Sequence, residues 1–249
     1  MRTALVLSAG GMFGAYQAGA WKAIARVCRP DLVVGASAGA LNGWAIAGGC
    51  TPEDLISRWL DPRAGLLKFR NAGVLERGAR EIFEAFQPCI EFQPIVTEWP
   101  SCRPRAVPWR EVTWRHLAAS CSIPGVTQLR RIDGKLLADG GIVRALPLWT
   151  VAQRGDIGRV IAVSLLDHPP SRMLRAVMGA FRSLARVPQL APGIDVVMIA
   201  PGEPLGSLRD AVVWNRENAV RWIEKGEMDA QRALEIRYTS SIAPAAAHT

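Results

Sequence analysis

The sequence predicts an α/β fold, a three-layer α/β/α sandwich around a mainly parallel sheet. Two observations predict it: short apolar strands alternate with helical stretches, and each of the first two strands runs through small residues straight into a helix. A chain of 249 residues, 49% of them hydrophobic, can bury a large core. Because no Pro-, Ser- or Gly-rich linker divides the chain, we expect one domain over residues 1–249.

The first sixty residues contain two strand–turn–helix units and a further helix. Residues 4–7 read as a short apolar strand, and residues 15–27 after a glycine-rich loop read as a helix. A second strand ends at Val34 and is followed by a helix over residues 38–47. A Thr–Pro pair at residues 51–52 then begins a third helix. This order is typical of a parallel sheet covered on both faces.

The rest of the chain continues the alternation. We expect helices at residues 74–86, 109–122, 171–187 and 209–234, and strands at residues 90–99, 159–167 and 194–201. Asp133 and Gly134, between two short apolar runs, predict a tight hairpin, which places Asp139 at the end of its second strand. The tail from about residue 240 is expected to be frayed.

Composition and charge exclude several classes of protein. The net charge is +8, but no zinc finger, helix-turn-helix or alternation of aromatic and basic residues indicates nucleic acid, so we expect no nucleic-acid partner. Five cysteines without metal-ligand spacing favour reduced thiols in the cytoplasm, and we expect no metal and no cofactor. The excess of basic residues would favour binding to an anionic membrane surface, so peripheral contact with a membrane remains an alternative.

Two uncharged runs near the N-terminus need an interpretation. The run from Arg2 to Trp21 could pass for a secretory signal, but its four glycines predict a strand and a loop rather than a leucine-rich helix. The run over residues 32–51 is long enough for a membrane span, yet Gly, Ala, Ser and Asn fill it. We therefore expect the first run to be a strand and loop and not a signal, and the second to be buried inside the fold and not to span a membrane.

Ser37 lies in the pattern G-x-S-x-G, between a buried strand and a helix. In that context the pattern predicts a sharp turn that presents the serine as a nucleophile. Side chains at the flanking positions would collide with neighbouring strands, so Gly35 and Gly39 support the turn. The start of the following helix favours an oxyanion on an attacked carbonyl. The alternative is a turn made of small residues in which the serine has no catalytic role.

A glycine loop with Gly10, Gly11 and Gly14 connects the first strand to the first helix. The backbone N–H groups of such a loop can receive an anion. A nucleotide phosphate is the weaker interpretation, because the loop has neither the G-x-G-x-x-G order nor a GK[ST]. Beside Ser37, an oxyanion hole makes better chemical sense.

The base that activates Ser37 is either a histidine or a carboxylate. In an α/β-hydrolase triad the histidine follows the acid in the chain, which excludes His116 and leaves His248 in the tail and His168 in what reads as an exposed turn. A carboxylate beside a serine hydroxyl can take its proton directly.

Asp139, followed by Gly140 and Gly141, is the better placed candidate. The alternative is that Asp139 is an ordinary turn residue before glycine, without a catalytic role. The residues alone leave both interpretations open.

Together these motifs resemble the patatin-like phospholipase family in its bacterial form. The family pattern is a glycine-rich oxyanion loop, a G-x-S-x-G elbow and a D-G-G/A motif that completes a Ser-Asp dyad without histidine. Three further segments are similar: "ASCSIPGV" from Ala119, "IDGKLLADGGIVRALPL" from Ile132, and the stretch from Leu205 to Leu234. The resemblance covers residues 3–235, nearly the whole chain.

The resemblance implies roles for the matching residues. Ser37 is the implied nucleophile and Asp139 its base, with the N–H groups of Gly10, Gly11 and Met12 in the oxyanion hole. The implied activity is that of a serine acyl hydrolase that cleaves lipid esters, as a phospholipase A or a lysophospholipase, through an acyl-enzyme intermediate.

The sequence departs from the family pattern in the glycine loop. Where the family has G-G-G-x-R-G, this chain has Ala9 and Phe13 in place of the first glycine and the arginine. Phe13 removes a positive charge, for which Arg144 is one substitute. A catalytically weakened or non-enzymatic lipid-binding relative is therefore the alternative function.

Two rival chemistries also share the serine elbow. An acyltransferase of the malonyl-transfer kind would carry histidine where Ala36 stands, and a histidine-dependent esterase would rely on His168.

Basic amphipathic segments at residues 172–186 and 63–80 are candidates for membrane contact. Ordinary packing on the sheet explains such a helix as well, because a helix that flanks a sheet needs one apolar and one charged face. The sequence leaves both interpretations open.

Overall fold

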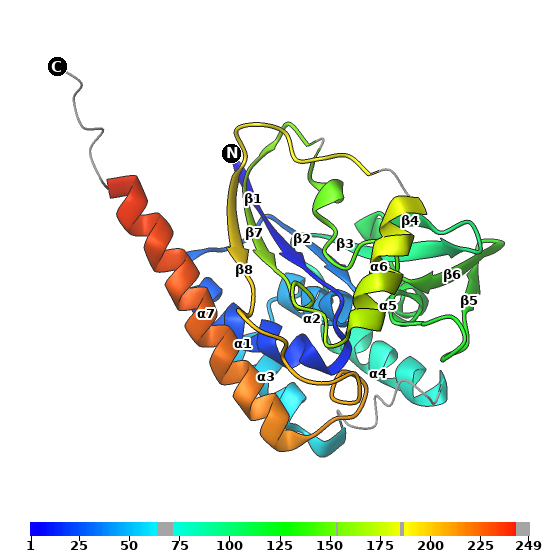
Figure 1. Cartoon of the computed structure of the whole chain (residues 1–249). Helices are drawn as coiled ribbons and strands as arrows, with labels where there is room; N and C mark the ends of the chain where they lie inside the picture. The colour runs from blue at the N-terminus through cyan, green and yellow to red at the C-terminus, as the bar shows by residue number, and fades with distance from the viewer. Residues whose placement is uncertain (64–71, 153, 185–186, 243–249) are drawn as a thin grey trace.

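The computed structural model describes residues 1–63, 72–152, 154–184 and 187–242 (Figure 1). Its strands are β1 (Arg2–Leu7), β2 (Leu32–Ala36), β3 (Glu91–Trp99), β4 (Arg103–Ala106), β5 (Arg130–Ile132), β6 (Lys135–Asp139), β7 (Ile157–Val163) and β8 (Asp195–Ile199). Its helices of more than one turn are α1 (Gly14–Val27), α2 (Ala38–Ala47), α3 (Pro52–Leu60), α4 (Ala72–Ala85), α5 (Trp114–Ser120), α6 (Arg172–Leu184) and α7 (Arg216–Ile242).

The described strands form one sheet in the order β5-β6-β3-β2-β1-β7-β8, with β4 paired to β3 outside this path. The run from β3 through β2, β1 and β7 to β8 is parallel, whereas the pairings of β4 with β3, of β6 with β3 and of β5 with β6 are antiparallel. The carboxyl ends of the parallel strands therefore meet at one edge, where ligand sites of such sheets lie. The predicted mainly parallel α/β fold is confirmed.

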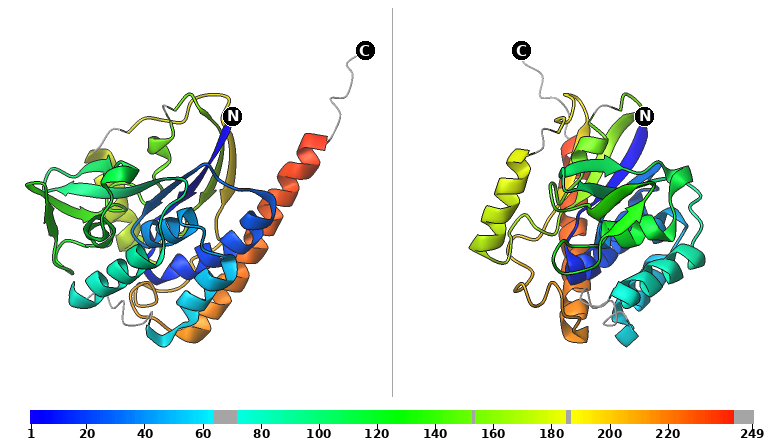
Figure 2. Two further views of the ribbon diagram at one scale, coloured as in Figure 1. Left: turned by 180° about the vertical axis from the view of Figure 1, so that it is seen from behind. Right: turned by 90° about the vertical axis from the view of Figure 1, so that its right-hand side faces the viewer.

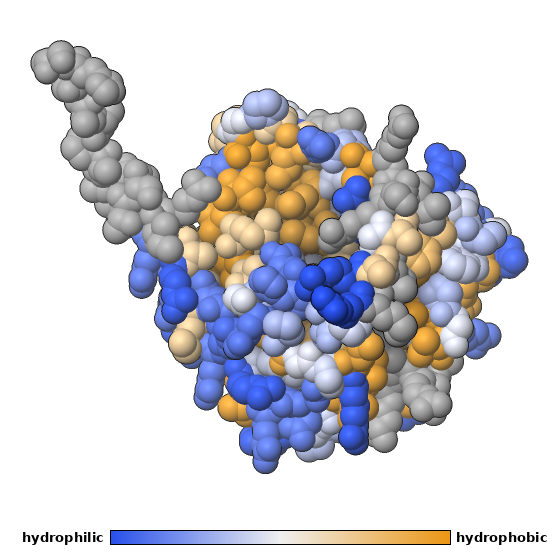
Figure 3. All heavy atoms as spheres, viewed as in Figure 1, coloured by the Kyte–Doolittle hydropathy of each residue, from blue (hydrophilic) through white to orange (hydrophobic). Residues whose placement is uncertain are grey.

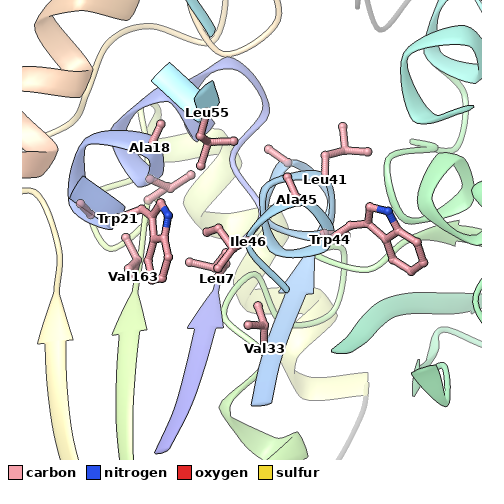
Figure 4. Close-up of a cluster of buried hydrophobic side chains, with 14 of the residues drawn as sticks. Leu7, Ala18, Trp21, Val33, Leu41, Trp44, Ala45, Ile46, Leu55 and Val163 are labelled. Atoms are coloured by element: carbon pink, nitrogen blue, oxygen red, sulfur yellow. The ribbon is translucent and has the colours of Figure 1, made fainter. Parts of the chain in front are cut away.

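The two faces of the sheet are covered unequally. Alternate strand residues point to opposite faces: Leu7 and Val33 contact the large core beneath α1 and α2, part of which Figure 4 shows. Val6 and Val34 lie on the opposite face, where the partly buried Met178 of α6 packs against the same cluster. Among the described helices of more than one turn, α6 alone covers that second face (Figure 2).

Helix α7 packs directly on α1, and glycine makes the close approach possible. A Cβ at Gly19 of α1 would lie 1.8 Å from the carbonyl oxygen of Ile223, and a Cβ at Gly226 of α7 would lie 2.0 Å from that of Tyr16. Backbone therefore meets backbone at this interface. The C-terminal helix is joined to the element that follows the glycine loop.

Most expected elements are present, and the exceptions have local causes. The hairpin is confirmed, with Asp133 and Gly134 at φ 48° and 76°. The helix expected from residue 109 is divided: Trp109–Glu111 form a 3₁₀ turn, and α5 begins at Trp114, after Thr113, whose N–H donates to the His116 side chain. The helix expected from residue 209 begins at Arg216, and β4 was not expected.

Two expectations fall partly outside the described residues. They are the frayed tail, of which residues 243–249 are not described, and the basic segment 63–80, of which residues 64–71 are not described. In the part of the chain that the structure covers, no helix has both the length and the apolar character that crossing a membrane requires.

Candidate active site

Ser37 lies at the sharp turn between β2 and α2, and it is only 3% exposed. Its φ of 55° and ψ of −124° form a conformation that residues other than glycine rarely adopt. A Cβ at Gly35 would lie 2.1 Å from the carbonyl oxygen of Gly39, and a Cβ at Gly39 would lie 2.6 Å from that of Leu7. Both glycines are therefore needed, Gly39 against β1 and Gly35 against the turn itself rather than a neighbouring strand.

Asp139 is the last residue of β6 and pairs with Val96 of β3. Because β3 also pairs with β2, the ends of β2 and β6 lie close together, and Ser37 and Asp139 line the same pocket. The Gly141 N–H donates to Asp139 Oδ1 over 2.7 Å. Burial raises the pKa of Asp139 to about 6, and the neighbouring Ser37 hydroxyl and the Gly141 N–H act in the opposite direction.

The remaining predicted support glycines are also sterically required. A Cβ at Gly140 would lie 2.1 Å from the carbonyl oxygen of Ile95, and a Cβ at Gly141 would lie 2.2 Å from the Cβ of Ala9. A Cβ at Gly14 would meet the Trp59 ring at 2.6 Å. The D-G-G turn is thus packed between β3 and the glycine loop.

The end of α5 holds both the serine turn and the aspartate. The Ser37 N–H donates to Ser120 Oγ over 2.9 Å, and that hydroxyl donates to the carbonyl oxygen of Ile95 over 2.6 Å. The Asp139 N–H donates to the carbonyl oxygen of Ser122 over 2.6 Å. Sequence reasoning gave Ser120 and Ser122 no role. Their S-C-S pattern at a helix end, within a segment similar to the family, was the available signal.

Cys121 lies between these two serines and also contacts the site. Its thiol is fully buried and lies close to the Ser37 side chain. Burial raises the pKa of this thiol well above its usual value, so it stays protonated at neutral pH. Cys121 therefore lies beside Ser37 as a neutral group and not as a thiolate.

The glycine loop after β1 lies beside Ser37. Gly10 and Gly11 line the same pocket as Ser37, and Gly11 has φ 59°, a conformation suited to glycine. No described residue accepts a hydrogen bond from the N–H of Gly10 or Gly11. The Met12 N–H is placed differently, because it donates to the carbonyl oxygen of Ala211 over 2.9 Å. In this arrangement Met12 is not free to receive an anion.

A buried polar network supports the glycine loop, and sequence reasoning missed it. The Gln17 amide donates to the carbonyl oxygen of Ser8, at the end of β1, over 2.8 Å. The Asn42 amide donates to the carbonyl oxygen of Gly14 and to Gln17 Oε1, over 3.0 and 2.9 Å. Trp59 Nε1 donates to Asn42 Oδ1 over 2.9 Å. Three helices contribute to this network, and no local sequence pattern marks its members.

Phe13, at the position of the family arginine, belongs to the core and not to the pocket. It is 1% exposed, and its ring packs edge-on against Trp222 of α7, with centroids 5.0 Å apart. Trp222 Nε1 in turn donates to the carbonyl oxygen of Leu205 over 2.8 Å. Aromatic packing thus anchors the loop here. Arg144, the candidate substitute cation, is not among the residues that line the pocket.

A pocket of about 460 Å³ adjoins Ser37 and Asp139. Its large apolar lining residues are Trp99, Ile123, Pro124, Ile142, Leu166, Pro170, Met178, Phe181, Leu208 and Val212. Among the described residues that line it, Asp139 alone has an ionisable side chain. Such a lining suits a hydrocarbon chain and offers no cation to a phosphate group.

The histidines lie elsewhere. His116 accepts a hydrogen bond from the Thr113 N–H over 3.2 Å at the start of α5. His168 is exposed and is not among the residues that line the pocket. His248 lies outside the described residues. Among the described residues that line the pocket with Ser37 there is no histidine, whereas Asp139 is one of them.

A serine on a strand–turn–helix elbow, beside a glycine loop at the carboxyl edge of a mainly parallel sheet, is typical of serine acyl hydrolases. The family model of the patatin-like phospholipases matches residues 5–152, more than half of the chain. The chain belongs to the patatin-like phospholipase family, and this membership implies lipid acyl hydrolysis.

Similar solved structures are more distant. The crystal structure of VipD from Legionella pneumophila is 13% identical with a TM-score of 0.56, and the match covers 94% of this chain and 67% of VipD. The type III effector protein ExoU is 13% identical with a TM-score of 0.45, over 95% of this chain and 53% of ExoU. At such identity the likeness to VipD concerns the fold alone. A search of curated protein sequences found no match.

Proposed function

We propose that the protein is a serine acyl hydrolase that cleaves carboxylic esters of lipids, with phospholipase A or lysophospholipase activity, through a dyad of Ser37 and Asp139. The observation that carries this proposal is the placement of the Ser37 hydroxyl next to the Asp139 carboxyl group, where both residues line one apolar pocket. Family membership supports the substrate class.

In the proposed first step, Asp139 takes the hydroxyl proton as Ser37 Oγ attacks the ester carbonyl carbon. The negative charge moves to the carbonyl oxygen, where the unpaired N–H groups of Gly10 and Gly11 would receive it. The tetrahedral intermediate then collapses, the C–O bond to the alcohol breaks, and protonated Asp139 gives its proton to the leaving oxygen. An acyl group remains on Ser37.

In the second step, water attacks the acyl-enzyme and Asp139 takes the proton of that water. The new tetrahedral intermediate releases the fatty acid, and the proton returns to Ser37. Asp139 performs both transfers without histidine, because its pKa of about 6 lies close to neutral pH. The apolar pocket beside the dyad would hold the acyl chain.

A weakened or non-enzymatic relative was the alternative suggested by Phe13. The position of this side chain supports the enzyme instead, because Phe13 contributes packing to the loop and leaves Gly10 and Gly11 in the pocket. The loop is also held by the polar network around Asn42. These contacts supply the order that a charge would otherwise provide.

The pH dependence of turnover is expected to follow Asp139. A base must be ionised to accept a proton, so kcat/KM should rise about tenfold per pH unit below pH 6 and level off above it. A pH series with a soluble ester measures this, with circular dichroism at each pH as the control for folding. A midpoint that moves in His168→Ala would contradict the assignment, because it would show that the imidazole is the base.

The proposal can be tested by labelling with a fluorophosphonate, which reacts with activated serines. Peptide mass analysis of the labelled protein should find the phosphonate on Ser37, and Asp139→Asn should label much more slowly, because the hydroxyl then lacks a base. Labelling at another serine would contradict the proposed nucleophile. Absence of labelling in the folded wild-type protein would instead favour a lipid-binding relative.

A further inference from the structure

Exposed apolar side chains border the pocket on the segment between β8 and α7. Leu208 and Val212 line the pocket and are nevertheless 39% and 40% exposed, so they lie where the pocket meets the surface. Val213, next in the chain, is 44% exposed. Burying such side chains would be favourable, so their exposure needs an explanation.

The segment that presents these side chains is held in place. The Ser207 N–H donates to Asp210 Oδ2 over 2.8 Å, and the Val213 N–H donates to the carbonyl oxygen of Arg209 over 2.8 Å. Trp214 Nε1 donates to the carbonyl oxygen of Trp59 over 2.9 Å. The turn therefore keeps Val212 and Val213 at the surface.

A second segment contributes to the same border. Ile123 and Pro124, which follow α5, line the pocket, and Val126 of the same turn is 48% exposed. The Val126 N–H donates to the carbonyl oxygen of Ile123 over 3.0 Å. Apolar side chains from two separate parts of the chain thus lie at the edge of one pocket.

Exposed arginines accompany these apolar residues. Arg209 is exposed on the same turn, and Arg172 and Arg175 are exposed on α6, the helix whose Met178 and Phe181 line the pocket. Residues 172–186 contain no acidic residue. In the segment between β8 and α7, the Asp210 carboxylate accepts hydrogen bonds from Ser207 and Asn218, whereas Glu203 is exposed. Figure 3 shows hydrophobic and strongly hydrophilic residues side by side on the face that carries α6.

We propose that these residues form a docking surface for an anionic lipid bilayer, here named the pocket rim: Val126, Arg172, Arg175, Leu208, Arg209, Val212 and Val213. Apolar side chains enter the boundary between head groups and acyl chains, while arginines contact anionic head groups. The proposal rests on the proposed function, since docking lets an acyl chain pass from the bilayer into the pocket. A protein bound at the same place would cover the pocket entrance, which favours a lipid surface as the occupant.

The test measures sedimentation of the Ser37→Ala protein with vesicles, so that hydrolysis does not alter the lipid. Vesicles of phosphatidylcholine and phosphatidylserine in equal amounts should bind the protein at least about tenfold more tightly than phosphatidylcholine alone, and salt should weaken the binding. Lack of binding to both vesicles, or equal binding to both, would overturn the proposal.

A matched pair of charge-changing variants locates the surface. Arg209→Glu with Val213→Asp, in the Ser37→Ala protein, should weaken binding to the mixed vesicles by about tenfold or more. The control is Arg29→Glu with Val27→Asp, which makes the same changes at exposed residues before β2, at the opposite edge of the sheet. Equal losses in the two variants would overturn the assignment of the surface. Circular dichroism checks that both variants are folded.

Failure of this inference can be told apart from failure of the proposed function. Turnover of a soluble ester by the wild-type protein, without vesicles, reports on the dyad alone. Turnover without selective vesicle binding would leave the hydrolase standing and overturn the pocket rim. Selective binding without turnover would support the pocket rim and overturn the proposed chemistry.

Discussion

Replacing Ser37 with alanine is expected to lower kcat/KM for an ester substrate by roughly four orders of magnitude or more. The reason is that alanine has no oxygen to attack the carbonyl, while the pocket and the amides of Gly10 and Gly11 remain. The fold should persist, because alanine keeps the Cβ and the backbone N–H that donates to Ser120. Release of p-nitrophenol from a medium-chain ester measures the loss.

The matched control is Ser101→Ala, which removes another hydroxyl, the one that donates to the carbonyl oxygen of Glu98 over 3.2 Å. This variant should keep full activity. If Ser37→Ala retained more than about one hundredth of the wild-type rate while remaining folded, Ser37 would not be the nucleophile.

Asp139→Asn is expected to lower kcat/KM by roughly a thousandfold or more, while leaving the geometry of the turn intact. The side-chain oxygen of the introduced asparagine could still accept from the Gly141 N–H, but an amide cannot take the proton of Ser37. The same p-nitrophenol assay measures the loss. His168→Ala is the control and should be nearly as active as the wild type. The reverse ranking of the two variants would indicate a histidine-dependent esterase.

Asp139→Asn should raise the free energy of unfolding although it lowers activity. Burial raises the pKa of Asp139 from 3.8 to about 6, so the folded protein holds this proton more tightly than the unfolded chain does. Ionisation of the Asp139 carboxyl group therefore lowers the free energy of unfolding. This loss is absent below pH 3.8 and grows to roughly 2–3 kcal/mol as the pH rises through 6.

An asparagine side chain carries no such cost, so Asp139→Asn should raise the free energy of unfolding by roughly this amount at pH 8. Urea denaturation measures it, and the gain should shrink at about pH 4, where Asp139 is largely protonated in the folded state and half protonated in the unfolded chain. A buried carboxyl group that destabilises the fold is most simply explained by its chemistry.

The features that sequence reasoning predicted have local signals. Short-range steric effects determine the turn at Ser37 and the hairpin at Asp133, so a few consecutive residues are enough to predict each of them. The mainly parallel sheet follows from the alternation of strands and helices, and Ser37 and Asp139 line one pocket at the carboxyl edge of that sheet.

The features that were missed depend on partners far apart in the sequence. Asn42 looks like an ordinary polar helix residue until Trp59 and Gln17 are placed around it. Met12 was expected to offer its N–H to an anion, yet the carbonyl of Ala211 occupies that group. Long-range pairing of this kind leaves no periodicity in the chain.

Residues much later in the chain hold the glycine loop in its conformation. Ser37 and Asp139 both lie within residues 5–152, the part that matches the family model, but Ala211 and Trp222, which brace Met12 and Phe13, do not. A truncated chain that ended near residue 152 would keep both proposed reacting groups and lose these braces. If the proposed chemistry holds, the smallest active unit therefore extends well beyond the segment that matches the family model.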